Sequence, residues 1–161
     1  MSELRHEPTD TPTLSLRRRV PIGELMAFQG EALAAVWAEL EKVAGEQSGH
    51  PYVRYWDMGA DEVDVEVGIP LAAPTAHPSD LAGSLPGGTH VVVRHDGAHD
   101  ALGAAYARLA EATGAHEPAG PPWEVYEWIP LHVEPNPATW APPAQWSTLL
   151  VQPVTAAAVD R

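Results

Sequence analysis

Two segments of the chain carry apolar residues at the spacing of an amphipathic helix. Residues 32–40 (ALAAVWAEL) and 101–109 (ALGAAYARL) each place a leucine, an aromatic residue and a second leucine four and three positions apart, which is one face of an α-helix. Aligned without gaps, the two segments agree at five of nine positions, and Trp37 stands opposite Tyr106. Any two alanine-rich helices could agree to this extent, so the flanking segments decide whether the chain contains a repeat.

The segments around the two predicted helices repeat in the same order. An extended run precedes each helix and ends at a glycine where the helix is expected to begin, and another glycine follows where a C-cap is expected. These glycines are Gly30 and Gly45 in the first half, and Gly97 and Gly114 in the second. An aromatic strand and a closing strand come next, at 51–58 and 61–71, and again at 122–129 and 145–154. The pattern therefore predicts the order β-α-β-β twice.

The repeat determines the expected architecture. One β-α-β-β unit would leave half of its apolar surface exposed to water, whereas two units related by a pseudo-twofold axis cover each other and leave a cleft between them. We therefore predict an α+β domain with an antiparallel sheet and a central ligand cleft. Its expected parts are a disordered tail at 1–13, a first unit at about 14–71, a connector at 72–84, a second unit at about 84–154 and a second tail at 155–161.

Charge and composition exclude several classes of function. The chain has 22 acidic residues against 9 lysines and arginines, a formal net charge of −13, whereas nucleic-acid binding requires cations that meet phosphates. The only basic cluster, Arg17 to Arg19, lies on a predicted strand that turns one arginine to the opposite face, so we expect no direct DNA binding. There is no cysteine, the first twenty residues lack the apolar core of a signal peptide, and no apolar run is long enough to span a membrane. We therefore expect a cytoplasmic protein without disulfides, thiolate metal sites or membrane contacts.

Two polar clusters have structural interpretations. His90, His95 and His99 could suggest a metal site, but strand geometry turns the first two to opposite faces, and no cysteine or helical histidine motif supports them. We expect turn-stabilising or exposed histidines and no metal. Residues 61–68 (DEVDVEVG) alternate so that Glu62, Asp64 and Glu66 share one face. A valine-rich strand lacks the turn of a calcium loop, so we expect a solvated strand face there.

The segment 121–128 (PPWEVYEW) is the strongest candidate for chemistry. A strand over these residues places Glu124, Tyr126 and Trp128 on one face. An exposed glutamate on an edge strand is one interpretation. The other is a pocket carboxylate, because a buried acid among aromatic rings needs a cation or hydrogen bonds, and the same grouping suits a flat lipophilic cation. The residues alone leave both interpretations open.

The aromatic composition favours a pocket or an interface. Six tryptophans and four tyrosines stand against one phenylalanine, and tryptophan and tyrosine combine a large ring with a polar tip. The candidate ligand-binding residues besides Glu124, Tyr126 and Trp128 are Trp37, Tyr55, Trp56, Tyr106, Trp140 and Trp146. Trp37 and Tyr106 hold equivalent places in the repeat and could instead be core residues.

Three motifs, taken in order and spacing, resemble the GyrI-like effector-binding domains, which also occur as drug-binding modules of AraC-type and MerR-type activators. The motifs are LPGGTHVVVRHDGAHDAL (85–102), PPWEVY (121–126) and QWSTLLVQPV (145–154), and the resemblance covers 14 to about 154. It implies two fused β-α-β-β units of the SHS2 type around a central cleft, with Glu124 in the ligand pocket. The haem-binding SOUL-type proteins share a related two-unit layout, but no histidine of this chain is placed as an axial haem ligand. We therefore expect no cofactor.

The resemblance implies three functions. The first is binding of hydrophobic, often cationic, aromatic small molecules, with Glu124 meeting the cation and Tyr126, Trp128 and other rings sandwiching its skeleton. The second is hydrolysis of strained cyclopropane rings in DNA-alkylating natural products, with Glu124 as general base. The third is an interaction with DNA gyrase through the acidic surface. Regulators of the family carry a helix-turn-helix domain, for which this chain has no room before Leu14 or after Arg161, so we expect no promoter binding.

Overall fold

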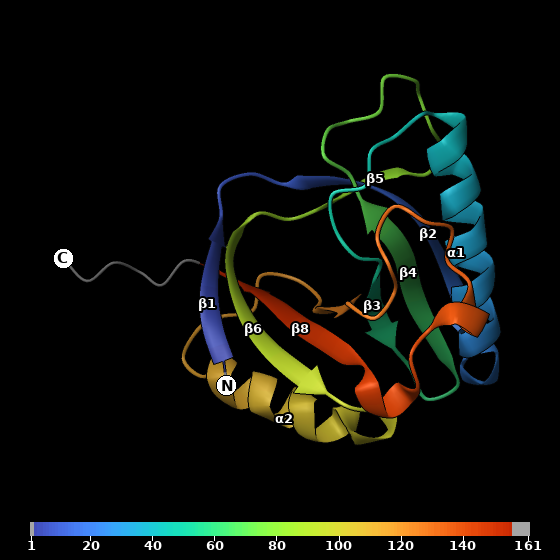
Figure 1. Cartoon of the computed structure of the whole chain (residues 1–161). Helices are drawn as coiled ribbons and strands as arrows, with labels where there is room; N and C mark the ends of the chain where they lie inside the picture. Colours follow the sequence, from blue (N-terminus) through green and yellow to red (C-terminus); the bar gives the residue numbers. More distant parts are fainter. Residues whose placement is uncertain (1, 156–161) are drawn as a thin grey trace.

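The strands of the computed structural model, which describes residues 2–155, form one antiparallel sheet in the order β1-β6-β8-β7-β3-β4-β2-β5 (Figure 1). Their bounds are β1 Ser2–Glu7, β2 Thr11–Pro21, β3 Tyr52–Met58, β4 Glu62–Pro70, β5 Ala82–Leu85, β6 Gly88–Asp96, β7 Trp123–Tyr126 and β8 Ser147–Val154. Two α-helices lie within the described range, α1 Leu25–Lys42 and α2 Leu102–Thr113. Short 3-10 helices occupy Ile22–Glu24, His99–Ala101, Pro137–Thr139 and Pro143–Gln145.

The internal repeat is confirmed, and it determines the centre of the sheet. The first unit, β2-α1-β3-β4, and the second, β6-α2-β7-β8, lie in mirrored order on either side of a seam at which β3 pairs with β7. Helix α1 packs on β2 and β4, and α2 packs on β6 and β8. In the seam Val53 lies opposite Glu124. These two residues hold the same place in their units, so the pseudo-twofold axis passes between them.

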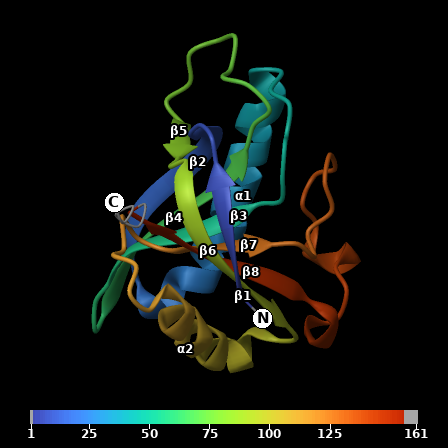
Figure 2. The same ribbon diagram turned by 90° about the vertical axis from the view of Figure 1, so that its left-hand side faces the viewer.

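Each unit lends an edge strand to the other. β1 runs into β2 of the first unit but pairs with β6 of the second, whereas β5 runs into β6 but pairs with β2. The exchange requires a curled sheet, because each edge strand reaches across from its own unit (Figure 2). The two crossing turns meet at Gly87, where a Cβ would lie 2.5 Å from the Thr9 carbonyl oxygen. The Gly87 N–H donates to Asp10 Oδ1 at 2.8 Å, so glycine fits this close approach.

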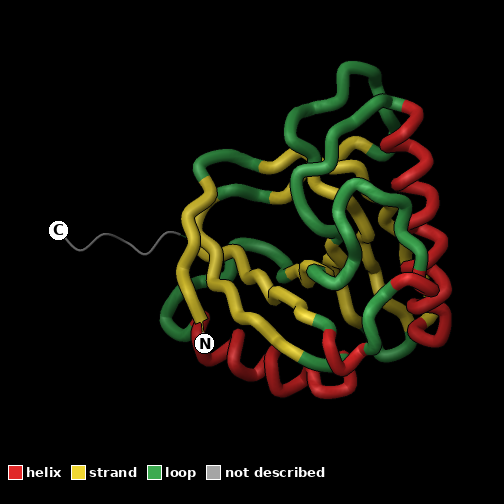
Figure 3. Tube along the Cα trace, viewed as in Figure 1, coloured by secondary structure: helices red, strands yellow, loops and turns green. Residues whose placement is uncertain are grey.

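The expected disordered tail at 1–13 is wrong for the described residues 2–13, which form β1 and the start of β2. β1 is almost wholly exposed, so no hydrophobic pattern marks it, and backbone hydrogen bonds to the edge of β6 hold it instead. The predicted connector likewise ends in β5. Of the expected C-terminal tail, Thr155 donates from its N–H and hydroxyl to the Glu117 carbonyl oxygen at 2.8 and 3.0 Å, and residues 156–161 lie outside the described residues (thin grey trace in Figure 3).

Two helix boundaries differ from the glycine-based prediction. The strand β2 ends at Pro21, and the chain turns into α1 soon after it, so Gly30 lies inside the helix. Proline ends the ladder because it has no N–H to donate. At the end of α1, Ala44 rather than Gly45 takes the left-handed conformation, with φ 51°. Gly114, with φ 48°, is the C-cap of α2 as predicted.

Each face of the curled sheet carries buried apolar clusters. On the face that carries the helices, α1 packs on a valine-rich cluster of β3 and β4, and α2 packs on residues of β6 and β8. On the opposite face one apolar cluster joins β3, β5, β6, β7 and β8, some of which are remote in the strand order, so the sheet curls around it. Its buried members are Tyr52, Leu85, Val92, Trp123, Leu149 and Val151.

Gly68 of β4 tests the packing inside the curl. The buried Tyr52 ring lies across this glycine, and a Cβ on Gly68 would be 2.6 Å from the tyrosine hydroxyl oxygen. We predict that Gly68→Ala lowers the free energy of unfolding by about 1–3 kcal/mol through overpacking, as measured by urea denaturation. Gly103→Ala is the control. A Cβ added at Gly103 would meet no atom within 4 Å outside its own stretch of helix, and alanine should stabilise α2 slightly. An unchanged midpoint for Gly68→Ala would contradict the packing.

Candidate ligand-binding site

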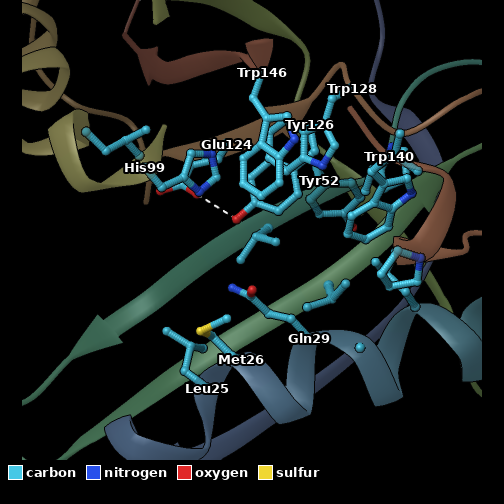
Figure 4. A pocket seen from close by; sticks show the side chains of 18 of the residues that line it. Leu25, Met26, Gln29, Tyr52, His99, Glu124, Tyr126, Trp128, Trp140 and Trp146 are labelled. Carbon is cyan, nitrogen blue, oxygen red and sulfur yellow. Dashed lines mark hydrogen bonds between the residues drawn. The ribbon is translucent and has the colours of Figure 1, made fainter. Parts of the chain in front are cut away.

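A cavity of about 550 Å³ lies between the two helices, next to the seam of the sheet (Figure 4). Its walls come from α1, β3 and β4 of the first unit. The second unit contributes β7, α2 and the 3-10 turn at His99–Ala101 that precedes α2. Residues 127–146, which link β7 to β8, form what we call the lid segment. This segment supplies Trp128, Ile129, Pro137, Trp140 and Trp146 to the walls. The volume is in the range of sites for drug-sized ligands.

Glu124 lines the cavity at the seam, and only 4% of its surface is exposed. Alternation along β7 turns its carboxylate to the same face as Tyr126, as predicted. The Tyr106 hydroxyl, from α2, donates to Glu124 Oε2 at 2.5 Å, and the Tyr126 hydroxyl donates to Oε1 at 2.8 Å. One hydrogen bond from a helix and one from its own strand therefore orient the carboxylate.

The carboxyl group of Glu124 is buried without a cationic side chain of the described residues beside it. Burial raises the pKa of the Glu124 carboxyl, and the two tyrosine hydrogen bonds oppose this shift. Burial, and after it the neighbouring carboxylate, raises the pKa of Tyr106 and Tyr126 above the ordinary value, so both tyrosines remain neutral donors. Among residues 2–155, no lysine, arginine or histidine forms an ion pair with Glu124.

Three aromatic rings form a continuous stack beside Glu124. The centroids of Tyr126 and Trp128 are 4.3 Å apart, and those of Trp128 and Trp146 are 4.1 Å apart with ring planes 4° from parallel. These rings already touch each other, so a ligand skeleton cannot lie between Tyr126 and Trp128 in this arrangement. A sandwich of the skeleton by these and other rings, as expected from the sequence, would therefore use the free faces and edges of the stack.

His99 completes this wall of the cavity, and the sequence analysis did not find it. Its ring meets Trp128 edge-on at a centroid distance of 4.9 Å, and its Nε2 lies 2.9 Å from Thr148 Oγ1. Burial, and secondly the neighbouring His95, lowers the pKa of His99, so its imidazole is neutral near pH 7. The repeat could have indicated this position of His99. His99 is the equivalent of Gly30 in the first unit, and both residues line the cavity.

The other two histidines of this region stabilise turns, as predicted. His95 Nε2 lies 2.9 Å from the Ala98 carbonyl oxygen, in the turn before α2. His90 Nε2 lies 2.9 Å from the carbonyl oxygen of Pro86, in the turn before β6. No group of three or more metal-binding side chains is present in the described part of the chain.

Five of the predicted aromatic residues line the cavity, namely Tyr55, Tyr126, Trp128, Trp140 and Trp146. Tyr106 is not in the wall, but its hydroxyl reaches Glu124 and its ring borders a neighbouring surface cleft. Trp37 lies outside the cavity and packs against the core cluster under the far end of α1, so its interpretation as a ligand-binding residue is wrong and the core alternative is confirmed. Tyr106 and Trp37 hold equivalent places but have different partners. The Tyr106 hydroxyl reaches the carboxylate of Glu124, whereas the first unit has Val53 at the place of Glu124.

The expectation for Trp56 is also wrong, and so is the one for Glu66. Alternation along β3 turns Trp56 to the face away from the helices, where the guanidinium groups of Arg17 and Arg54 lie 4.1 and 4.3 Å from its ring centroid. Its Nε1 donates to Glu66 Oε1 at 2.9 Å. Glu66, predicted on a solvated face, is 6% exposed and also accepts a hydrogen bond from Tyr52. The tyrosine lies across a glycine of β4 and covers this acid.

The wall formed by α1 was likewise missing from the sequence-based prediction. Met26, Gln29 and Leu33 line the cavity at helical spacing, and Gln29 Nε2 donates to the Tyr55 hydroxyl at 3.4 Å. Leu33 holds the same place in its unit as Leu102, and both line the cavity. The equivalence of these leucines was visible in the repeat, but an apolar helix face predicts core before it predicts a pocket wall.

No protein-family model and no curated protein sequence matches the chain, but solved structures do. The C-terminal domain of EcmrR matches with a TM-score of 0.75 at 19% identity, over 96% of this chain and 97% of that one. A hydrolase from Listeria innocua matches with a TM-score of 0.61 at 14% identity, over 96% and 91%. SAV2435, solved with bound tetraphenylphosphonium, matches with a TM-score of 0.59 at 11% identity, over 96% and 94%.

The chain has the GyrI-like fold. This follows from the eight-stranded antiparallel sheet with its two helices and from the match to the EcmrR C-terminal domain along nearly its whole length. At these identities the similarity concerns the fold alone. The chain spans 57% of the longer EcmrR chain seen in a complex with DNA. In the described residues no helix has both the length and the apolar character needed to cross a membrane.

The burial of Glu124 predicts a fold stability that decreases as its carboxyl ionises. A pKa raised in the folded protein means that the native state binds the proton more tightly than the unfolded chain, so deprotonation above the ordinary value of 4.5 lowers the free energy of unfolding. We predict that Glu124→Gln stabilises the ligand-free protein near pH 7 and has little effect at about pH 4, where both states bind the proton. Thermal unfolding across this pH range measures the difference.

Glu127→Gln is the matched control for this experiment. Glu127 lies three residues further along, outside the cavity wall, and its carboxylate forms an ion pair with Arg94. Its replacement should change the stability by at most about 1 kcal/mol, because the arginine is half exposed. If Glu124→Gln were less stable than the wild type near pH 7, the hydrogen bonds of the carboxylate would outweigh its burial and the prediction would be wrong.

Proposed function

We propose that the cavity binds lipophilic cations with an aromatic skeleton. The observation that carries the proposal is Glu124, a carboxylate that is 4% exposed, lies in an aromatic-lined cavity and has no cationic side chain as a partner among the described residues. A buried charge of this kind is unfavourable for folding. A ligand that carries a positive charge compensates it. The tyrosine donors are neutral, so they do not cancel the negative charge of the carboxylate.

The rings of the wall supply the remaining attraction. The stack of Tyr126, Trp128 and Trp146 lies beside the carboxylate, and Tyr55 and Trp140 line the cavity toward the first unit. Ring faces attract cations as well as aromatic skeletons. The net charge of −13 raises the local concentration of cations around the protein. SAV2435, which shares the fold, was solved with tetraphenylphosphonium, an aromatic cation of this class, and this supports the proposal by analogy.

Methyltriphenylphosphonium and its neutral isostere triphenylethane separate charge from shape. We predict that Glu124→Gln weakens binding of the cation by about 1.5–3 kcal/mol, the range for interactions that involve a charged group. Binding of the neutral isostere should change by less than about 0.5 kcal/mol. Titration calorimetry measures the cation, and competition against a fluorescent cationic dye measures the isostere.

The Glu127→Gln variant controls this measurement as well, because it removes the same charge from the protein outside the cavity wall. It should leave the affinity for the cation within about twofold of the wild type, since the charge it removes is screened by water and salt. An equal loss of the cation and of its isostere in Glu124→Gln would show a change of shape rather than of charge, and would refute the electrostatic role of Glu124.

Hydrolysis of a strained electrophile is a second candidate function of the same cavity. The raised pKa of Glu124 favours it, because a carboxylate of higher pKa is a stronger base toward water. Glu124 would take a proton from water while the water oxygen forms a bond to a cyclopropane carbon. The ring C–C bond would break, and its electron pair would pass to the conjugated carbonyl group of the substrate, which then gains a proton.

Mass spectrometry distinguishes this turnover from binding. If the second candidate is correct, incubation with a cyclopropane-bearing DNA alkylator should give a product heavier by one water, and Glu124→Ala should lose most of the rate, by about 10²–10⁴-fold for a general base. Tyr55→Phe, which removes a cavity hydroxyl that is not hydrogen-bonded to Glu124, should retain product formation. Product at the level of the Glu124→Ala background would remove hydrolysis and leave the binding proposal intact.

A further inference from the structure

Two tryptophans of the lid segment have buried indole N–H groups without an acceptor. Trp128 Nε1 and Trp140 Nε1 are shielded from water, and no oxygen or nitrogen atom of the described residues accepts from them. Both rings line the cavity. Buried donors are almost always paired in folded proteins, because an unmade hydrogen bond is unfavourable. Two such donors at one cavity indicate that something outside the chain provides the acceptor.

Two other indoles donate to protein acceptors, which provides a comparison. Trp146, the third tryptophan of the lid segment, donates to the Ala141 carbonyl oxygen at 2.8 Å. Trp56 donates to Glu66 on the other face of the sheet. Trp128 and Trp140 differ from these two, because their buried N–H groups have no acceptor among the described residues and both rings line the cavity.

The open donor of Trp140 and the carboxylate lie at different ends of the cavity. Glu124 is hydrogen-bonded to Tyr106 of the second unit, whereas Trp140 packs against the apolar cluster of α1, β3 and β4. Trp128 lies nearer the carboxylate, because its ring is stacked on Tyr126. Figure 4 shows Glu124 and Trp140 on opposite sides of the cavity. On the α1 side the wall between them carries Leu33 and Gln29. The cavity thus has a negative group at one end, one open donor near it in the aromatic stack, and a second open donor at the other end.

We propose that the preferred ligand carries, besides its cationic centre, an acceptor oxygen of an ester, ketone or ether group that binds the indole N–H of Trp128 or Trp140. This inference rests on the proposed function. The ring has to turn its buried N–H toward such an acceptor, and this turn breaks no side-chain hydrogen bond, since neither indole has one among the described residues. The acceptor distinguishes this ligand class from purely hydrocarbon cations such as tetraphenylphosphonium.

Two cations of equal size test the acceptor. Pentyltriphenylphosphonium and (ethoxycarbonylmethyl)triphenylphosphonium share the charge and the rings and differ in the ester. We expect the ratio of their dissociation constants to shift against the ester by about threefold to tenfold in Trp128→Phe or Trp140→Phe, the effect of one hydrogen bond. Trp146→Phe is the matched control, because it removes the same ring area from the same wall but an N–H that is already paired, and it should weaken both cations equally.

Each outcome of the titration has a defined meaning. An unchanged ratio in both Trp128→Phe and Trp140→Phe, with Glu124→Gln still weakening both cations, overturns the acceptor inference and leaves the proposed function standing. If neither cation binds the wild type, both proposals fail.

A measurement on the wild type keeps the inference testable if a variant does not fold. In protein labelled with ¹⁵N at tryptophan, the ester cation should move the indole N–H resonance of Trp128 or Trp140 further downfield than the pentyl cation does, because a new hydrogen bond deshields the proton. The resonance of Trp56, on the other face of the sheet, serves as the reference. Equal shifts with both cations would overturn the inference.

Discussion

The burial of one carboxylate without a counter-charge is the constraint on which the site depends. Glu124 stands on β7 opposite Val53, where the two units meet, and the helices of both units leave a cavity over that point. Two neutral hydroxyls, from Tyr106 and Tyr126, orient the carboxylate and leave its charge in place. An arginine or lysine in the same position would make an internal ion pair, and a cationic ligand would then have no charge to meet.

The duplicated fold supplies a symmetric frame, and the chemistry comes from departures from it. The frame consists of equivalent pairs that line the cavity, Leu33 with Leu102 and Tyr55 with Tyr126. The departures are Glu124 in place of Val53, and His99 in place of Gly30. A third departure is the lid segment, since 59–61 joins β3 to β4 whereas 127–146 joins β7 to β8. All three place polar and aromatic groups on the second unit, so the carboxylate and the imidazole of the cavity lie on that side.

The sequence predicted the features that depend on local periodicity and missed those that depend on which strands become neighbours. The repeat and the direction of Glu124 followed from the 3.6- and 2-residue periods. β1 could not be predicted, because a polar edge strand is held by backbone hydrogen bonds that carry no side-chain signal. His99 and Trp56 were misjudged for a related reason. Only the fold brings the start of α2 to the lid segment, and only the sheet register brings Trp56 to Glu66.

A second buried carboxylate in the same molecule shows how far environment separates two chemically identical groups. Glu66 lies on the other face of the sheet, directly opposite Arg17 on β2 and Arg54 on β3, and its oxygens accept from Tyr52 and Trp56. Protein groups thus surround this acid with donors and positive charge, and no ligand is needed to account for its burial. Glu124 has tyrosine donors of the same kind but no arginine. The difference between the two sites is one of charge compensation, so the proposed ligand role of Glu124 rests on the missing cation more than on the burial or the hydrogen bonds.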